Sequence, residues 1–162
     1  MSCPLCRESG GEVVWHDDAL RVVLPDEPDF PAFTRVIWQA HVAEMTDLPA
    51  PGRTRLLEAV LVVEAAMRAA LRPDKVNLAS LGNAVPHLHW HVVPRFADDA
   101  RFPGSPWSAA ATTAGAAAAQ RRAVERRDAL RALLPAYRDA LVEALEAWRG
   151  TPFALPSAAD PR

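Results

Sequence analysis

The sequence has few cysteines and no long apolar run. Cys3 and Cys6 are the only cysteines among 162 residues, and two residues so close together cannot cross-link distant parts of a fold. No apolar run approaches the roughly 18 residues that a membrane-spanning helix needs, and the first residues lack the charged and apolar segments of a signal peptide. These absences exclude a disulfide-stabilised scaffold and predict a soluble, cytoplasmic protein without a membrane partner.

Positive charge is not in excess either. The chain has 18 basic and 20 acidic residues, which give a net charge of −2 and a pI near 6.2. Without a positive field over the whole surface, a nucleic acid polymer is not an expected partner, and a phosphate ligand would need a local site. The hydrophobic fraction of 50% is enough for one compact domain with a core and a ligand pocket.

The first hundred residues alternate between strand patterns and a helix pattern. Five strands are expected from apolar alternation, at residues 12–15, 20–24, 34–38, 75–81 and 88–93. Apolar side chains at helical spacing predict one long amphipathic helix over residues 53–72, which Pro73 ends. The pattern predicts an α+β fold in which a helix covers an antiparallel sheet.

The composition changes beyond residue 95. Residues 102–107 predict an irregular arm, and the alanine-rich residues 108–119 have little but helix propensity to order them. Apolar positions predict a second helix over residues 121–148, which Pro135 kinks or splits. We therefore divide the chain into a core domain (1–107), a helical extension (108–150) that covers the sheet or completes a dimer, and a flexible tail (151–162).

Three of the five histidines alternate along the last predicted strand. In the run His87-Leu88-His89-Trp90-His91 the imidazoles point to one face, about 6.5 to 7 Å apart, while the apolar side chains point to the core. We expect the histidine face to be exposed, because packing alone does not require these residues. Solvated or hydrogen-bonded histidines are the simplest alternative. A zinc site is the sharper one, since imidazoles two residues apart on a strand can share a metal.

The histidine run resembles the H-x-H-x-H-x-x signature of the histidine triad (HIT) superfamily. The turn at residues 82–85, Gly-Asn-Ala-Val, resembles the family's Gly-Gln-x-Val, and residues 31–41 resemble its P-G-H-T-L-V-I-P-K-x-H strand. The likeness is greatest to bacterial HIT-domain hydrolases of the diadenosine polyphosphate hydrolase type, over residues 75–96. It implies a HIT-like fold with a five-stranded antiparallel sheet, one long helix after the third strand, and a homodimer.

The resemblance implies chemistry at the α-phosphate of a nucleotide. His89, the middle histidine, would attack phosphorus and form a nucleotidyl-histidine, which water or another acceptor resolves. A neutral imidazole suits this role, because its unperturbed pKa of about 6.5 leaves a nucleophilic nitrogen at pH 7. His87 would help to hold the tautomer of His89, and His91 would contact the phosphoryl oxygens or assist the leaving group. This covalent chemistry requires no cofactor.

Three further residues are predicted nucleotide contacts. Backbone N–H groups near Gly82 and the side-chain amide of Asn83 can meet charge on the phosphoryl oxygens. Asp26 lies where the family has an acidic residue that binds the ribose hydroxyls, and its alternative role is to cap a turn. Ala32 and Phe33 replace the family's Gly-His, so we expect the nucleoside pocket to differ at that edge.

Cys3 and Cys6 have the C-x-x-C spacing of a zinc or redox pair, which supplies half of a tetrahedral site. In some bacterial HIT proteins a similar pair binds zinc together with two histidines, which correspond here to His41 and His87. The resemblance thus implies a structural Cys2His2 zinc site that fixes the orientation of His87. The alternative is two reduced, partly buried thiols beside a His41 that caps local backbone.

The leading hypothesis is an enzyme of the HIT family, a hydrolase or nucleotidyltransferase that cleaves nucleoside 5′-phosphoryl compounds such as dinucleoside polyphosphates or nucleoside phosphoramidates. The alternative is a nucleotide- or zinc-binding regulatory protein with little turnover. The complete H-x-H-x-H run argues against this alternative, because loss of the nucleophile is the simplest route to a non-catalytic relative.

Overall fold

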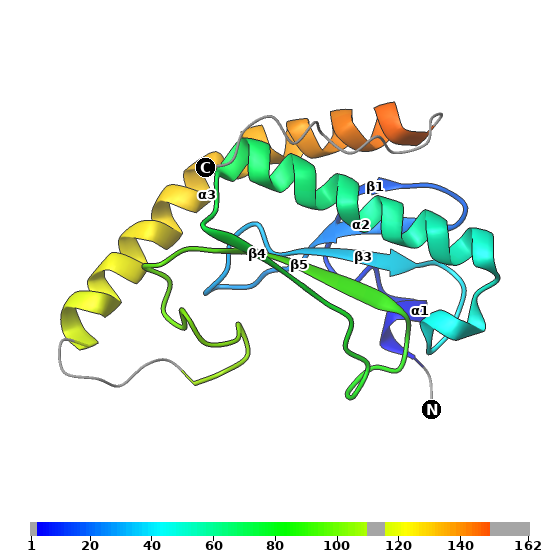
Figure 1. Ribbon diagram of the computed structural model, residues 1–162, viewed down its shortest axis with the longest axis horizontal. Helices are drawn as coiled ribbons and strands as arrows, with labels where there is room; N and C mark the ends of the chain where they lie inside the picture. Colours follow the sequence, from blue (N-terminus) through cyan, green and yellow to red (C-terminus); the bar gives the residue numbers. More distant parts are fainter. Residues whose placement is uncertain (1–2, 110–115, 150–162) are drawn as a thin grey trace.

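The computed structural model describes residues 3–109 and 116–149 of the chain, and its centre is one antiparallel sheet (Figure 1). Neighbouring strands follow the order β1-β2-β3-β5-β4, and every neighbouring pair is antiparallel. The strands are β1 Glu12–His16, β2 Leu20–Leu24, β3 Thr34–Trp38, β4 Lys75–Ala79 and β5 His89–Arg95. The predicted α+β fold is confirmed; β2 and β3 have the predicted ends, and the ends of the other three strands differ from the predicted ones by at most two residues.

Two long helices cover one face of the sheet, α2 Ala50–Leu71 and α3 Ala116–Arg149 (Figure 1). α2 carries a proline in its first turn, where the missing N–H costs no hydrogen bond, and ends at Arg72 in a left-handed conformation before Pro73. Five residues of the predicted apolar stripe are buried, Leu56, Val60, Val63, Met67 and Leu71, together with Ala59, Val62 and Ala66. Leu57, which was also predicted for this stripe, faces solvent, with 41% of its surface exposed.

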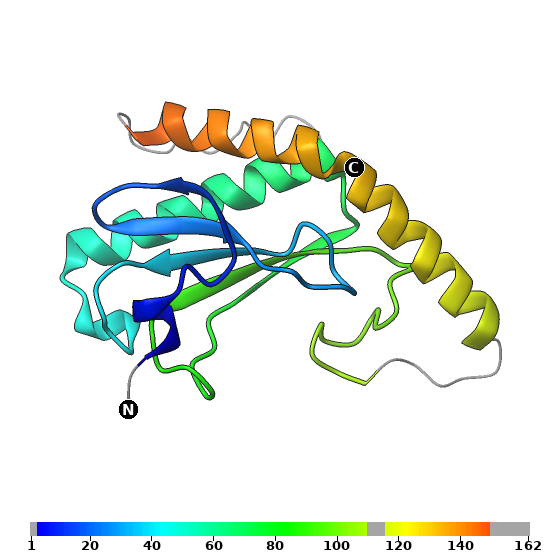
Figure 2. The same cartoon turned by 180° about the vertical axis from the view of Figure 1, so that it is seen from behind.

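α3 is one continuous helix that contains Pro135. Figure 2 shows that it changes direction about midway, as expected where a proline removes a backbone donor and its ring crowds the preceding turn. The predicted kink is therefore found, but not the split. From Leu130 onward it belongs to the same hydrophobic core as the sheet and α2, through Leu130, Tyr137, Leu141, Leu145 and Trp148. The buried Tyr137 hydroxyl lies 2.8 Å from Thr34 Oγ1 of β3.

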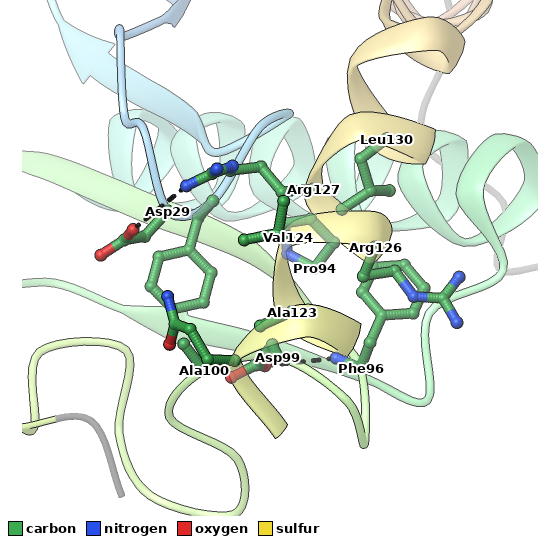
Figure 3. A pocket seen from close by; sticks show the side chains of 12 residues that line it. Asp29, Pro94, Phe96, Asp99, Ala100, Ala123, Val124, Arg126, Arg127 and Leu130 are labelled. Atoms are coloured by element: carbon green, nitrogen blue, oxygen red, sulfur yellow. Dashed lines mark hydrogen bonds and ion pairs between the residues drawn. The ribbon is translucent and has the colours of Figure 1, made fainter. Parts of the chain in front are cut away.

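The first half of α3 packs against the segment that follows β5. Arg126 forms a two-pronged ion pair with Asp98 and stacks over the Phe96 ring at 4.7 Å. Figure 3 shows the small pocket at this seam, where Arg127 points toward Asp29. No predicted site residue lines the pocket. The flexible tail predicted at 151–162, and most of the alanine-rich stretch before α3, lie outside the described residues.

The opposite face of the sheet carries the histidines. It is covered by the short helix α1 Pro4–Arg7, by the loop between β4 and β5, and by the arm after β5, whereas the 3-10 turn η1 Met45–Asp47 leads into α2. Apolar residues under these segments form two small clusters, Leu5 with Val23 and Ile37, and Phe30 with Phe33 and Val93. Within the described ranges, no helix is both long and apolar enough to cross a bilayer.

Candidate functional site

The three histidines come from β5 and the loop just before it. β5 pairs with β3 so that His91 lies opposite Arg35 and His89 lies opposite Ile37. His87 precedes the strand, in a segment fixed by backbone hydrogen bonds from His87 N to Val85 O at 2.8 Å and from Leu88 N to Val42 O at 2.7 Å. The predicted alternation thus places all three imidazoles on one face of the sheet.

That face is not exposed, which corrects the sequence-based expectation. His87, His89 and His91 retain only 1%, 7% and 5% of their surface exposure. Phe33 and Trp107 pack edge-on against the His91 ring at 5.3 and 5.4 Å, and the N-terminal segment lies against His87. The rings of His89 and His91 are also closer than predicted, with their centroids 4.7 Å apart.

The tautomer of His89 follows from its hydrogen bond. Its Nδ1 lies 2.5 Å from the carbonyl oxygen of His87, and because a carbonyl only accepts, Nδ1 carries the proton and Nε2 keeps its lone pair. Burial lowers the pKa of His89, and the charge of Arg35 lowers it further, against the opposing effect of the carbonyl. His89 is therefore a neutral imidazole with a free nucleophilic nitrogen at pH 7.

His91 is the more strongly perturbed member. Burial, the neighbouring His89 and the charge of Arg35 together lower its pKa from 6.5 to about 3. Its Nδ1 is buried and makes no hydrogen bond to any residue that the structure describes. His91 is thus neutral, and one of its ring nitrogens, close to His89, is without a hydrogen bond to any described residue.

An open hollow of about 420 Å³ lies over His89 and His91. Its wall brings together one side of the N-terminal segment, β3 and the loop before β5: Pro4, Leu5, Glu8, Gly10, Arg35, Leu81, Gly82, Asn83, Ala84 and Val85. Gly82 and Asn83, the predicted phosphate contacts, therefore line the same hollow as His89. Gly10 has a φ of +83°, and a Cβ there would lie 2.7 Å from a Leu5 methyl group, so glycine lets this wall close.

Asp26 is not brought to this hollow. It is exposed and lines a neighbouring one together with Gly11, Pro31 and Arg138 of α3. Ala32, which stands where the resembled signature has glycine, keeps a left-handed φ of +68° and closes the same turn. A ribose-binding role for Asp26 stays a prediction.

The four predicted metal ligands do converge. The sulfur atoms of Cys3 and Cys6 and one ring nitrogen each of His41 and His87 all lie within 4.8 Å of one another. His87 Nδ1 is 3.4 Å from Cys3 Sγ, 3.5 Å from Cys6 Sγ and 3.4 Å from His41 Nδ1, and Cys6 Sγ is 3.4 Å from His41 Nδ1. Four soft donors from three separate segments thus meet at one point.

These spacings fit a tetrahedral zinc ion. Zn–S bonds of about 2.3 Å and Zn–N bonds of about 2.0–2.1 Å at tetrahedral angles require about 3.6 Å between sulfur and nitrogen and about 3.3 Å between nitrogens. The remaining ring nitrogen of His87, Nε2, donates to the Trp38 carbonyl at 2.7 Å, which leaves Nδ1 unprotonated toward the cluster. Donor chemistry, spacing and tautomer all suit a structural zinc site.

Arg21 of β2 holds the cysteine-bearing segment against the sheet. Its buried guanidinium donates to the carbonyl oxygens of Leu5 at 2.6 Å and Ser9 at 3.0 Å, and to the Gln39 side chain at 2.7 Å. α1 itself begins at Pro4, whose fixed φ suits a first helical position. A four-residue helix is too short for a helical pattern of apolar residues to be recognised in the sequence. Pro4 is the one local feature that indicates where it begins.

Two other residues of the candidate site were not predicted. Arg35 lies on the histidine face and lines the hollow, and its only sequence signal is a charge inside an otherwise apolar strand. Trp107 lies at the end of the arm, 49% exposed, with its ring against His91. Its position depends on how the arm folds back, which no local pattern indicates.

Comparisons with known proteins agree with this geometry. The HIT domain family profile matches residues 7–98, which is more than half of the chain. A zinc-bound histidine triad family protein from Mycobacterium smegmatis is 25% identical, with a TM-score of 0.57 over 91% of this chain and 98% of the other. No curated protein matches the chain.

Other solved structures share the fold at lower identity. A histidine triad protein from Sinorhizobium meliloti has a TM-score of 0.59 at 23% identity, over 77% of this chain and 96% of the other. A hypothetical histidine triad nucleotide-binding protein from Sulfolobus tokodaii has a TM-score of 0.55 at 19% identity, over 90% of each chain. Sheet order, histidine run and family profile lead to one conclusion: the chain belongs to the HIT domain family.

Proposed function

We propose that this protein is a hydrolase or nucleotidyltransferase that acts at the α-phosphate of nucleoside 5′-phosphoryl compounds through a nucleotidyl-His89 intermediate. The HIT domain family comprises nucleotide-binding proteins and hydrolases. The observation that carries the proposal is the hydrogen bond from His89 Nδ1 to the His87 carbonyl, since it leaves Nε2 free as a nucleophile inside a ligand-sized hollow.

The neighbouring groups suit the two steps of this reaction. Nε2 of His89 would attack phosphorus, the bond from phosphorus to the leaving group would break, and water or another acceptor would then take the nucleotidyl group. Backbone N–H groups at Gly82 and the Asn83 amide line the same hollow, where they can stabilise charge on the phosphoryl oxygens. The His91 side chain lines the hollow as well, and its imidazole can offer a further hydrogen bond to the substrate.

Substitution of the nucleophile tests the proposal. His89→Ala should abolish turnover of adenylyl substrates while the protein still folds and binds AMP, because only the attacking atom is lost. Mass spectrometry of the wild type, quenched after brief exposure to substrate, should find one nucleotidyl group on the peptide that contains His89. Retained turnover in His89→Ala would refute the assignment.

The alternative is a nucleotide- or zinc-binding regulatory protein with little turnover. It predicts nucleotide binding without cleavage of a phosphorus–oxygen or phosphorus–nitrogen bond across a substrate panel. A transferase would differ from a hydrolase in its products, because adding phosphate as the acceptor would change the nucleotide released.

We also propose that Cys3, Cys6, His41 and His87 bind one structural zinc ion. The support is the spacing of their four donor atoms and the carbonyl that accepts from His87 Nε2. Metal analysis of protein purified without added zinc should give one equivalent per chain. A homodimer, as the family resemblance implies, is tested on the same sample by light scattering.

A further inference from the structure

Arg35 is the only positively charged side chain in the wall of the hollow over His89 and His91 within the part of the chain that the structure describes. It lies on β3, directly opposite His91 on β5, so both side chains point to the same face. The strand signature that residues 31–41 resemble has leucine at this position. The positively charged Arg35 therefore lies near His89, at a strand position where an apolar side chain would be sufficient for packing.

The Arg35 guanidinium makes few and long polar contacts, although its side chain is only 24% exposed. Its Nη1 donates to the Gly10 carbonyl at a long 3.3 Å, and Nη2 approaches the carboxylate of Glu27 at 3.7 Å. Nε is buried and makes no hydrogen bond to any described residue. Arginine has five N–H donors, so most of this capacity is unused.

The surroundings favour an anionic ligand over the present partners. The guanidinium lies over the Phe33 ring at 5.5 Å, which orients it while leaving its edge free. Glu27 is 39% exposed and can turn to solvent at little cost, since such surface ion pairs are weak. Glu8 is the only acidic residue in the described wall, and its exposed carboxylate is screened by water.

We propose that Arg35 binds the negatively charged oxygens of the leaving group and selects substrates with a phosphoric anhydride over those with a neutral amine leaving group. This inference rests on the proposed function. A planar guanidinium matches the paired oxygens of a phosphate, and hydrogen bonds between charged groups are about twice as strong as neutral ones. Arg35 is thus a specificity-determining residue of the hollow.

The chemistry of the leaving group points the same way. When His89 Nε2 bonds to the α-phosphorus of an anhydride, the bridging P–O bond breaks and its electron pair stays on the departing phosphate oxygen, which needs no proton at neutral pH. An amine would have to collect a proton as its P–N bond breaks. His91 lies among aromatic rings and is neutral at pH 7, so it offers no ready acid for that step.

Two substrates with the same adenylyl group test the inference. Diadenosine triphosphate has an anionic leaving group, and adenosine 5′-phosphoramidate releases ammonia. Arg35→Leu should lower kcat/KM for the triphosphate by about 10- to 100-fold, as expected for lost hydrogen bonds to a charged group, and for the phosphoramidate by less than about 3-fold. Arg35→Lys should recover part of the loss, and Arg68→Leu on the exposed side of α2 should change neither substrate.

Binding of inorganic tripolyphosphate gives a readout that needs no turnover. Its dissociation constant, measured by calorimetry, should rise by a similar factor in Arg35→Leu and less in Arg35→Lys. An equal loss on both substrates, or unchanged tripolyphosphate binding in a folded Arg35→Leu, would overturn the inference. A wild type that cleaves neither substrate and forms no adduct would refute the proposed function instead, and the calorimetry would still decide the role of Arg35.

Discussion

Removal of zinc should destabilise the protein by an amount that can be calculated. The four donors join the N-terminal segment to the end of β3 and to the loop before β5, and no other metal-donor cluster is found among the described residues. A ligand present at 100 to 1,000 times its dissociation constant stabilises the folded state by about 2.7 to 4.1 kcal/mol. With an unfolding entropy of about 2.1 cal/mol/K per residue, 162 residues give a decrease in Tm of about 8 to 12 °C.

The assay is differential scanning calorimetry of the purified protein with and without a zinc chelator, followed by zinc addition. Cys6→Ser is the matched control, because it should melt near the chelated wild type and show no further change with chelator. A wild-type Tm that the chelator leaves unchanged, in protein that metal analysis shows to contain zinc beforehand, would refute a structural role for the cluster.

Four other predictions address single groups. His87→Cys should retain zinc at a site of three cysteines and one histidine and should keep much of the activity. His87→Ala should lose the metal, and metal analysis with kinetics of both variants checks the difference. Arg72→Gly should raise the free energy of unfolding by about 0.5 to 1 kcal/mol in urea titrations, because it relieves an exposed left-handed residue at the end of α2. Tyr137→Phe should lower the free energy of unfolding by about 1 kcal/mol. Thr34→Val should lower it by about 1 to 3 kcal/mol, because it removes the hydroxyl partner of the buried Tyr137 hydroxyl. The double variant should lose less than the sum of the two single losses. For His91, the folded pKa of about 3 lies below the unfolded value of 6.5, so the unfolded chain binds more protons between these values and stability falls as the pH falls through that window. As the pH falls, the free energy of unfolding of the wild type should therefore decrease by up to about 1.4 kcal/mol per pH unit more than that of His91→Gln.

The sheet and the main helices could be predicted because each has a local pattern. β3 and β5 alternate between a core face and a histidine face, and α2 repeats its apolar side chains at helical spacing between two prolines. Pro135 indicated a kink by its missing donor, but whether the helix continued depended on packing against α2 and the sheet. The ends of strands depend on pairing partners and were accordingly less well placed.

The burial of the histidines could not be predicted from the strand itself. It results from contacts between residues far apart in the chain, such as Cys3 with His87, 84 positions away, and Trp107 with His91. Arg21 and Arg35 escaped prediction for the same reason, since their partners are backbone carbonyls of the N-terminal segment. A sequence pattern indicates which face a side chain takes, and only the tertiary fold decides what covers that face.

His87 connects the proposed zinc site to His89 through two different atoms. Its ring nitrogen Nδ1 faces Cys3 and Cys6, whereas its backbone carbonyl accepts the hydrogen bond from His89 Nδ1. The contact with His89 is therefore made by the main chain of His87 and not by its ring, so the imidazole is available for the proposed zinc ion. Because Pro4 and Leu5 of the same cysteine-bearing segment line the hollow, fixing His87 also fixes one wall of the site in which His89 would react.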